Sequence, residues 1–528
     1  MVVTLVALAL SATRLLLPLA DDYHDELAYW VGGLLEHPVR IKALGMSWHG
    51  LGPSIELDGV TVLDSAGTHT LLRCDSARID IDVFSSLRHW QVELGQFTVR
   101  GAHVSVLRQT DGTLAVMGLD NLDEMSPDPA AQQAFKQWLA RQRQLVMEDS
   151  TLRWRDLTRH GEVLTFRGVQ VQMRNRGAGH RLEMTAALPE QLGEQLTLLA
   201  DVRGDLFRPA AWDGQLYVRG VGLRAEAWGD IYAWPQVAVR GGILDFTLWS
   251  EWQNGLQRVS GDVSAFKPVM AITRVTAPLP APSRNEVMPG ETMRAAADEA
   301  AVPGDSVSLG RVHGRFQWRQ LPGGWLLDVD GFSLQNGAAP AWPPSQVRVS
   351  YRNGESPLRP QVEAAFSYVN LADTLGLAWQ AGAVPAAQRE RLAQLAPRGE
   401  LRDGYLRYQW GGDAPPAWLL RTGFQHMTVA AAGSLPGISG LSGNLISDGA
   451  RGVVTLDSGA GEFDAPNLFR APLPLGALQG QLAWRSEGES WQVASHALRL
   501  RNDDIGGAAA FRVVRTGGVA TPYIDLHV

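Results

Sequence analysis

Most of the chain alternates hydrophobic and polar residues in short runs that Gly- and Pro-rich segments separate. Between residues 244 and 248, for example, Leu244, Phe246 and Leu248 alternate with Asp245 and Thr247. Successive side chains of a β-strand point to opposite faces, so this period of two places the three hydrophobic residues on one face. The pattern predicts a mainly β protein made of antiparallel strands joined by tight turns.

Helical periodicity interrupts the predicted strands at three places. We expect a helix near residues 21–36, an amphipathic helix at 128–147 and a helical segment at about 369–396. The second prediction rests on Phe135, Trp138, Leu139, Leu145 and Val146, whose spacing fits one helical face. Strands resume after each of them.

The chain divides into four predicted regions: an apolar segment at 1–20, a β-rich region at 21–275, a Pro- and Ala-rich linker or loop at 276–308, and further strands at 309–528. The last run, TPYIDLHV, alternates without a terminating signal, so we expect that the chain is truncated and that more strands follow. The first apolar run lacks a basic residue ahead of it, which suggests a true start upstream.

Residues 2–20 have the length and composition of a transmembrane helix. Their Leu and Val residues contribute about −3 to −6 kcal/mol to insertion, against roughly +2.5 to +3.5 kcal/mol for Arg14. A cleaved signal peptide is the alternative, but no small-residue cleavage site follows. Acidic residues follow the segment without basic ones, which favours translocation of everything after residue 20.

The composition excludes some functions and leaves others without support. A net charge of −8 and only three lysines argue against a nucleic-acid partner. The single cysteine, Cys74, cannot form an internal disulfide, and we interpret it as a small buried residue. No phosphate loop, zinc-protease helix, nucleophile elbow or thiol redox pair occurs, and the twelve histidines show no ligand spacing. We therefore expect no catalytic residue, no metal and no cofactor.

Two motifs that resemble sites have simpler explanations. The acidic residues of DID at 80–82 and of DVD at 328–330 alternate with Ile or Val, so we expect them on the polar face of a strand rather than around a cation. GLSG at 440–443 is interpreted as a turn between strands.

Several segments together resemble a known family. The start TRLLLPLADDYHDELAYWVGGLLEHPVRIKALGMSWHGLGPSIELDGVTVLD resembles YhdP-type members of the bacterial AsmA-like family, and LPGISGLSGNL, FDAPNLFRAPLPLGALQGQLAWR and LRLRNDDIGGAAAFRV resemble its middle section. The resemblance covers nearly the whole chain. It implies an inner-membrane anchor followed by an elongated, curved antiparallel β-sheet groove of repeating units with a few short helices, in proteins longer than this one.

The resemblance also implies a function. Such proteins carry phospholipids between the inner and outer membranes along a hydrophobic groove, with the inner membrane, acyl chains and membrane proteins as partners, and a single-pass anchor that leaves the body in the periplasm. In each strand, the alternating hydrophobic residues share one face, and these residues are then expected to line the groove: Leu244, Phe246, Leu248, Leu327, Val329, Val347, Val349, Val454 and Leu456. The alternative is a structural or regulatory envelope protein with closed β-sandwich cores and no lipid. An enzyme with unrecognised carboxylates is a third possibility.

Overall fold

The computed structural model describes most of the chain after its first segment, in two compact units. The described residues are 38–528 without 50–51, 64–69, 91–93, 109–113, 118–138, 141, 158–162, 206–210, 232–236, 273, 276–300, 303–305, 355–358, 381–383, 385, 412–414, 434, 468, 503–505 and 519–520. Unit 1 comprises residues 1–223 and 245–257, and unit 2 comprises 224–244 and 258–528. The predicted anchor at 1–20 and helix at 21–36 lie outside the described residues.

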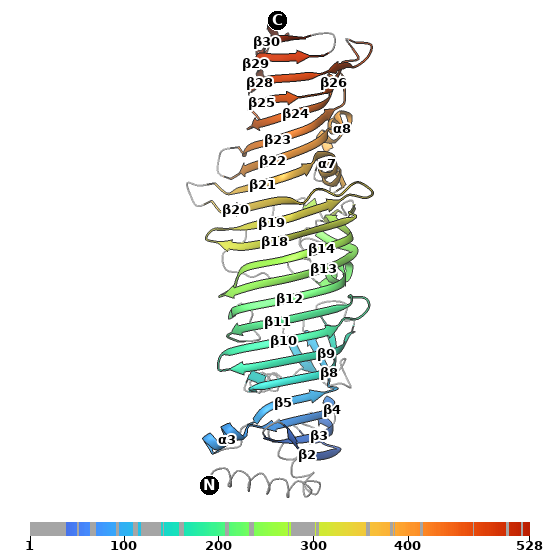
Figure 1. The fold of residues 1–528 in the computed structure, drawn as a ribbon, viewed down its shortest axis with the longest axis vertical. Coiled ribbons are helices and arrows are strands. Elements are labelled where there is room, and N and C mark those ends of the chain that lie inside the picture. The colour runs from blue at the N-terminus through green and yellow to red at the C-terminus, as the bar shows by residue number, and fades with distance from the viewer. Residues whose placement is uncertain are drawn as a thin grey trace. The chain divides into compact units, whose positions relative to one another are not determined.

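The described residues of unit 1 form β-strands and one short helix, α3 (Val83–His89). Its strands are β1 (Val39–Arg40), β2 (Ala43–His49), β3 (Gly52–Leu63), β4 (Thr70–Ile81), β5 (Leu94–Arg100), β6 (His103–Arg108), β7 (Leu114–Met117), β8 (Gln144–Asp156), β9 (Val163–Arg176), β10 (Gly179–Ala187), β11 (Gln195–Arg203) and β12 (Asp213–Arg224). From β8 to β12 each strand pairs antiparallel with the next, and Figure 1 shows them following one another in chain order. β8 also pairs in parallel with β5 and β6.

The described residues of unit 2 form antiparallel strands and three short helices. The strands β13 (Val237–Gln253) and β14 (Leu256–Ile272) contain the boundary between the units. The strands that follow are β17 (Ser306–Ser308), β18 (Arg311–Leu321), β19 (Gly324–Gln335), β20 (Ser345–Arg352), β21 (Gln361–Asn370), β22 (Arg398–Gln409), β23 (Ala417–Val429), β24 (Gly437–Ser447), β25 (Arg451–Ser458), β26 (Gly461–Asp464), β27 (Leu473–Leu475), β28 (Ala477–Glu487), β29 (Ser490–Arg501), β30 (Gly506–Arg515) and β31 (Tyr523–His527). The helices are α5 (Ala225–Ile231), α7 (Leu371–Gln380) and α8 (Ala386–Leu395), and β15 (Arg274–Val275) pairs with β16 (Ala301–Val302).

The pairing in unit 2 follows the chain almost without exception. The order is β14, β18, β19, β20, β21, β22, β23, β24, β25, β28, β29, β30 and β31, and every pair is antiparallel. Pro322 and Gly323 form the two-residue turn between β18 and β19, and Gly323 has φ 69°. The mainly β fold is therefore confirmed, and its local order comes from successive hairpins.

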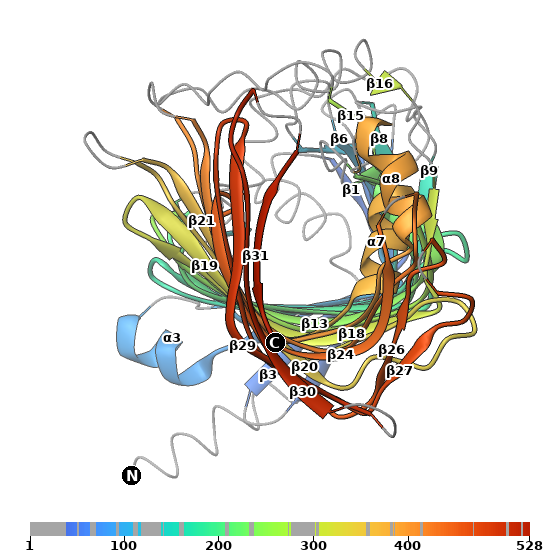
Figure 2. The ribbon, with the colours of Figure 1, turned by 90° about the horizontal axis from the view of Figure 1, so that it is seen from above.

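Bulges bend the long strands of unit 2 near their middles. The register shifts after His313 in β18, around Gly331 in β19, at Asp403 in β22 and at His426 in β23. Gly331, Asp403 and His426 have positive φ values of 63°, 50° and 51°. A bulge kinks its strand and increases the local twist. Figure 2 shows the strands of this unit curved, with α7 and α8 on the inner side of the curve.

Three buried clusters provide the cores. In unit 1 the cluster includes Leu57, Val60, Cys74 and Val99. In unit 2 one cluster surrounds Trp342 and a second contains Phe424, Leu456, Leu475 and Leu478. The interpretation of Cys74 as a small buried residue is confirmed, because its side chain is 3% exposed.

Three sequence predictions need correction. The amphipathic helix at 128–147 is wrong at its end, because β8 begins at Gln144 and places Leu145 opposite Phe97 and Met173 in the sheet. A short apolar run fits both periods, and here sheet pairing decides. The predicted linker at 276–308 ends in a strand, because β17 pairs with β14. GLSG lies inside β24, not at a turn.

Gly440 explains why GLSG resembles a turn. It has φ 73° within the strand, and a Cβ atom there would lie 2.4 Å from the carbonyl oxygen of Ala460. Only glycine combines this conformation with so close an approach. The helical segment predicted at about 369–396 is confirmed as α7 and α8. No helix among the described residues is both long and apolar enough to cross a membrane.

Candidate functional site: the apolar faces of the two units

The apolar face of unit 2 is set by its strand register. Leu327 in β19 lies opposite Trp318 in β18 and Val349 in β20. Residues directly opposite each other in antiparallel strands point to the same face. The face extends through the opposed pairs Val349–Ala364, Ala364–Leu406 and Leu406–Leu420, and Val329 similarly lies between Phe316 and Val347.

The same register brings β24, β25 and β28 to this face. Leu420 lies opposite Ser447, which is two residues from Leu445, and Leu445 faces Val454. Val454 in turn faces Leu482. Six of the predicted lining residues therefore share one face of unit 2: Leu327, Val329, Val347, Val349, Val454 and Leu456. The first four and Val454 are half-buried, whereas Leu456 is buried in a core cluster.

This face carries no charge at these paired positions. In the rows of opposed residues that contain Leu327, Val329 and Val454, none of the described residues is Asp, Glu, Lys or Arg, whereas farther along β22 the same alternation reaches Arg402, opposite Tyr368. The charges lie on the other face, where Arg315 pairs with Asp330 at 3.0 Å and Arg319 with Asp328 at 3.7 Å. The prediction that the DVD acids occupy a polar strand face is confirmed.

Aromatic rings lie over glycines of neighbouring strands on the apolar face. A Cβ atom at Gly404 would lie 2.0 Å from Cζ of Phe366, and one at Gly452 would lie 2.1 Å from Cζ2 of Trp484. Each ring therefore occupies the space that a side chain on the next strand would need. The glycines let these large rings lie close to the backbone, so the face is apolar without being filled by tall side chains.

A row of aromatic residues follows one end of these strands. Trp325 and Tyr351 have ring centroids 6.2 Å apart, Tyr351 and Trp410 stack at 6.2 Å, and Tyr408 and Trp410 stack at 5.7 Å. Tyr408 is 41% exposed and Trp418, which faces it, is 39% exposed. Tyr and Trp combine an apolar body with a polar tip, so such a row suits a boundary between apolar groups and water.

Unit 1 has its own apolar face. Met184 in β10, Leu198 in β11 and Val218 in β12 are directly opposed, and all three are half-buried. The ring of Phe246 lies over Gly220, where a Cβ atom would be 3.0 Å from Cε1. Phe246 and the half-buried Leu248 belong to unit 1, whereas Leu244 belongs to unit 2. The predicted residues therefore belong to both units.

Sequence reasoning missed several residues of these faces. Phe316, Trp318, Phe366, Leu406 and Leu420 lie in the same rows as the predicted residues. The alternation in RFQWRQ and YLRYQW would have identified some of them. The strand register could not be predicted, because a bulge inserts one residue and thereby changes which of the alternating side chains lie on the apolar face.

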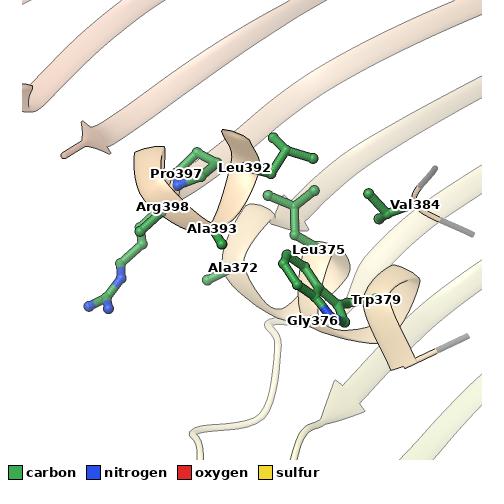
Figure 3. Close-up of a pocket in the computed structure, with 10 residues that line it drawn as sticks. Ala372, Leu375, Gly376, Trp379, Val384, Leu392, Ala393, Pro397 and Arg398 are labelled. Atoms are coloured by element: carbon green, nitrogen blue, oxygen red, sulfur yellow. The ribbon is translucent and has the colours of Figure 1, made fainter. Parts of the chain in front are cut away.

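An apolar pocket lies between α7 and α8 in unit 2. It has a volume of about 210 Å³, and Leu375, Trp379, Val384 and Leu392 line it, with Pro397 at its edge. In Figure 3 these side chains point between the helices, while the Arg398 side chain points away from them. α7 is attached to the sheet by Asp373, which accepts hydrogen bonds from Trp342 Nε1 at 2.8 Å and Asn336 Nδ2 at 3.1 Å.

Burial shifts the pKa of both Cys74 and Tyr368. No group of three or more potential metal ligands occurs among the described residues. Burial, with a smaller effect of Asp75, raises the pKa of Cys74 to about 11, so its thiol stays protonated. Burial also raises the pKa of Tyr368, which packs with Trp342 under α7. These perturbed groups belong to packed cores.

The fold and its apolar faces define a class: a β-rich protein in which long antiparallel strands carry rows of apolar, uncharged residues on one face. Comparison with protein families then identifies the group. The model of the YhdP protein family matches residues 1–528, and the chain belongs to this family, as a YhdP-type AsmA-like member. No curated protein and no solved structure matches the chain.

Proposed function

We propose that this protein carries phospholipids, whose acyl chains lie on the apolar faces of its sheets, between the inner and outer bacterial membranes. In this proposal residues 2–20 anchor it in the inner membrane as a single span, and the body lies in the periplasm. Its partners are phospholipids, the inner membrane and proteins of the two membranes. Carriage of this kind needs no catalytic residue, metal or cofactor, and the protein is not an enzyme.

The observation that carries the proposal is the half-buried, uncharged face of consecutive strands in unit 2. An ordinary sheet face in a soluble protein is either packed into a core or polar. Here Leu327, Val329, Val347 and Val349 remain half-buried among the described residues, and Leu406 is 38% exposed. Hydrophobic surface of this extent favours an apolar partner. Membership of the YhdP family supports acyl chains as that partner.

The contacts on this face suit a ligand that moves. Aliphatic and aromatic side chains attract an acyl chain through many weak and similar contacts. No position among those rows would bind a hydrocarbon segment much more strongly than its neighbour, so sliding requires no large barrier. The aromatic row from Trp325 to Trp418 would lie at the level where an ester or headgroup meets water.

The core clusters favour a second candidate, a structural envelope protein with filled cores. Leu456 and Phe424 are 5% and 8% exposed, as expected of an ordinary core. This cluster occupies only part of the face, however, because the rows from Trp318 to Leu406 have no comparable cover among the described residues. Bound lipid therefore distinguishes the candidates.

Purification of the full chain tests the proposal. The chain is extracted from membranes, exchanged repeatedly into a detergent that removes loosely held lipid, and analysed for phospholipid by mass spectrometry. A single-span membrane protein of similar size, treated in parallel, is the control. We expect phospholipid at or above one molecule per chain and a clear excess over the control. Equal amounts of phospholipid in this protein and in the control protein would favour the structural envelope protein with filled cores.

A further inference from the structure

Helix α3 in unit 1, with the residue that caps its C-terminus, exposes several large apolar side chains. Phe84 is 80% exposed, Leu87 62% and Trp90, its C-terminal cap, 86%, while Val83 is 40% exposed. None of the helix residues is buried. Figures 1 and 2 show α3 projecting from the ends of the strands, away from the sheet. So much exposed apolar area on so short a segment marks an interaction surface.

The apolar residues of α3 occupy one side of the helix. At 100° per residue, Phe84, Leu87 and Val83 fall within a single arc, and Ser85 and Ser86 lie on the opposite side. Arg88 lies at the edge of the apolar arc, and the helix itself contains no acidic residue. Aromatic and aliphatic residues with a flanking Arg are typical of helices that lie in a membrane interface.

The structure fixes this helix in place. Asp82 caps its first turn by accepting a hydrogen bond from the Ser85 backbone N–H at 2.9 Å. Arg143 Nη1 donates to Asp82 Oδ2 at 3.1 Å and to Ser85 Oγ at 3.0 Å, which attaches the helix to the residue just before β8. At the other end Trp90 adopts a left-handed conformation, with φ 55°, and its N–H bonds to the Ser86 carbonyl. The apolar side chains are therefore held outward by a defined local structure.

We propose that α3 lies in the headgroup region of a phospholipid bilayer, with Phe84, Leu87 and Trp90 inserted between lipids. The proposed anchor indicates this partner. The apolar run at 2–20 ends a short distance before Pro38, where the described part of unit 1 begins, and α3 belongs to this unit. Arg88 complements anionic headgroups. The inference rests on the proposed membrane anchor, but it does not require lipid to move along the sheets.

A second contact with the bilayer has a consequence for unit 1. A single transmembrane span leaves the attached body free to tilt and rotate. α3 follows β4 directly, so its insertion would hold the ends of β4 and β5 near the lipid surface. The first strands would then have a defined orientation to the membrane.

Fluorescence quenching in vesicles tests this proposal on the full chain. Leu87→Cys is labelled with a polarity-sensitive dye and reconstituted in phosphatidylethanolamine vesicles with a minority of phosphatidylglycerol. Cys74 is 3% exposed, so the native chain without an added cysteine measures background labelling. Glu183→Cys, an exposed position on β10 of the same unit, is the matched control. Lipids carrying a doxyl quencher near the headgroup or near the acyl end report depth.

We expect the label at residue 87 to emit at shorter wavelength and to be quenched several-fold more strongly than the label at 183, with the shallow quencher more effective than the deep one. Adding Phe84→Ser and Trp90→Ser should remove this quenching without changing the circular dichroism spectrum, because both side chains are exposed. Equal quenching at 87 and 183, or a label at 87 that stays in water, would overturn the proposal. A helix that binds another protein gives this second result, because these vesicles contain no other protein.

Discussion

A carboxylate placed on the apolar face of unit 2 should disturb lipid binding far more than one on the other face of the same strand. Val329→Asp puts the charge between Phe316 and Val347. Leu326→Asp, three residues away in β19, puts the same charge opposite Arg319 and Ser350. Both substitutions replace a half-buried aliphatic side chain with the same acid, one on each face of the strand.

The expected magnitudes follow from these neighbours. Losing a half-buried Val or Leu costs about 1 kcal/mol, half of the value for a fully buried side chain. At residue 329 the unpaired carboxylate adds about 1–3 kcal/mol, because no cation or hydrogen-bond donor faces it in the register. At residue 326 the attraction between the new carboxylate and the opposed Arg319 offsets roughly 0.2–1 kcal/mol of this loss in stability. We expect Val329→Asp to destabilise unit 2 by about 2–4 kcal/mol and Leu326→Asp by about 1 kcal/mol or less.

The assay compares phospholipid retained by the two full-length variants with the unsubstituted chain. Chemical denaturation first shows that both variants remain folded at the assay temperature. Val329→Asp should lose most of its bound phospholipid, and Leu326→Asp should keep nearly all of it. If folded Val329→Asp retained as much lipid as Leu326→Asp, acyl chains would not lie along this part of the face, and the reasoning would be refuted.

Three further predictions concern stability and reactivity. Gly404→Val should destabilise unit 2 by about 1–3 kcal/mol in denaturant unfolding, since its Cβ atom would overlap the Phe366 ring; an unchanged midpoint would contradict the close packing. Trp342→Phe removes the indole N–H that donates to Asp373, and it should cost about 1–3 kcal/mol; no loss would mean that the bond contributes nothing to the attachment of α7. The raised pKa of Cys74 predicts that stability is retained below about pH 9 and falls by about 2–3 kcal/mol as pH rises towards 11, whereas Cys74→Ala should lack this fall.

The sequence predicted the β class, and for many strands it predicted which side chains share a face. Alternation in Leu327–Val329 and in Val347–Val349 reports directly which side chains share a face. The turn at Pro322-Gly323 was readable because glycine with positive φ is typical of a tight hairpin. Family resemblance supplied the expected function, and the family assignment is confirmed.

Features that depend on residues distant in the chain could not be predicted from the sequence pattern. The parallel pairing of β8 with β5 and β6 joins residues 48 positions apart, and it turned the end of a predicted helix into a strand. The bulges at Gly331 and Gly440 change the inward parity within one strand, so alternation alone assigns the wrong face beyond them. The exposed side chains of α3 were missed because a seven-residue helix gives too short a periodic signal.

The central claim is that acyl chains lie on the apolar faces, and photo-crosslinking in living cells tests it most directly. A photoreactive amino acid is introduced at Leu248 or Val329 on the apolar faces and, as matched controls, at Thr247 or Leu326 on the opposite faces of the same strands. After irradiation, each purified chain is analysed for covalently attached phospholipid. The proposal predicts adducts at residues 248 and 329 and none at 247 and 326. Equal labelling of both faces, or labelling of neither, would contradict it.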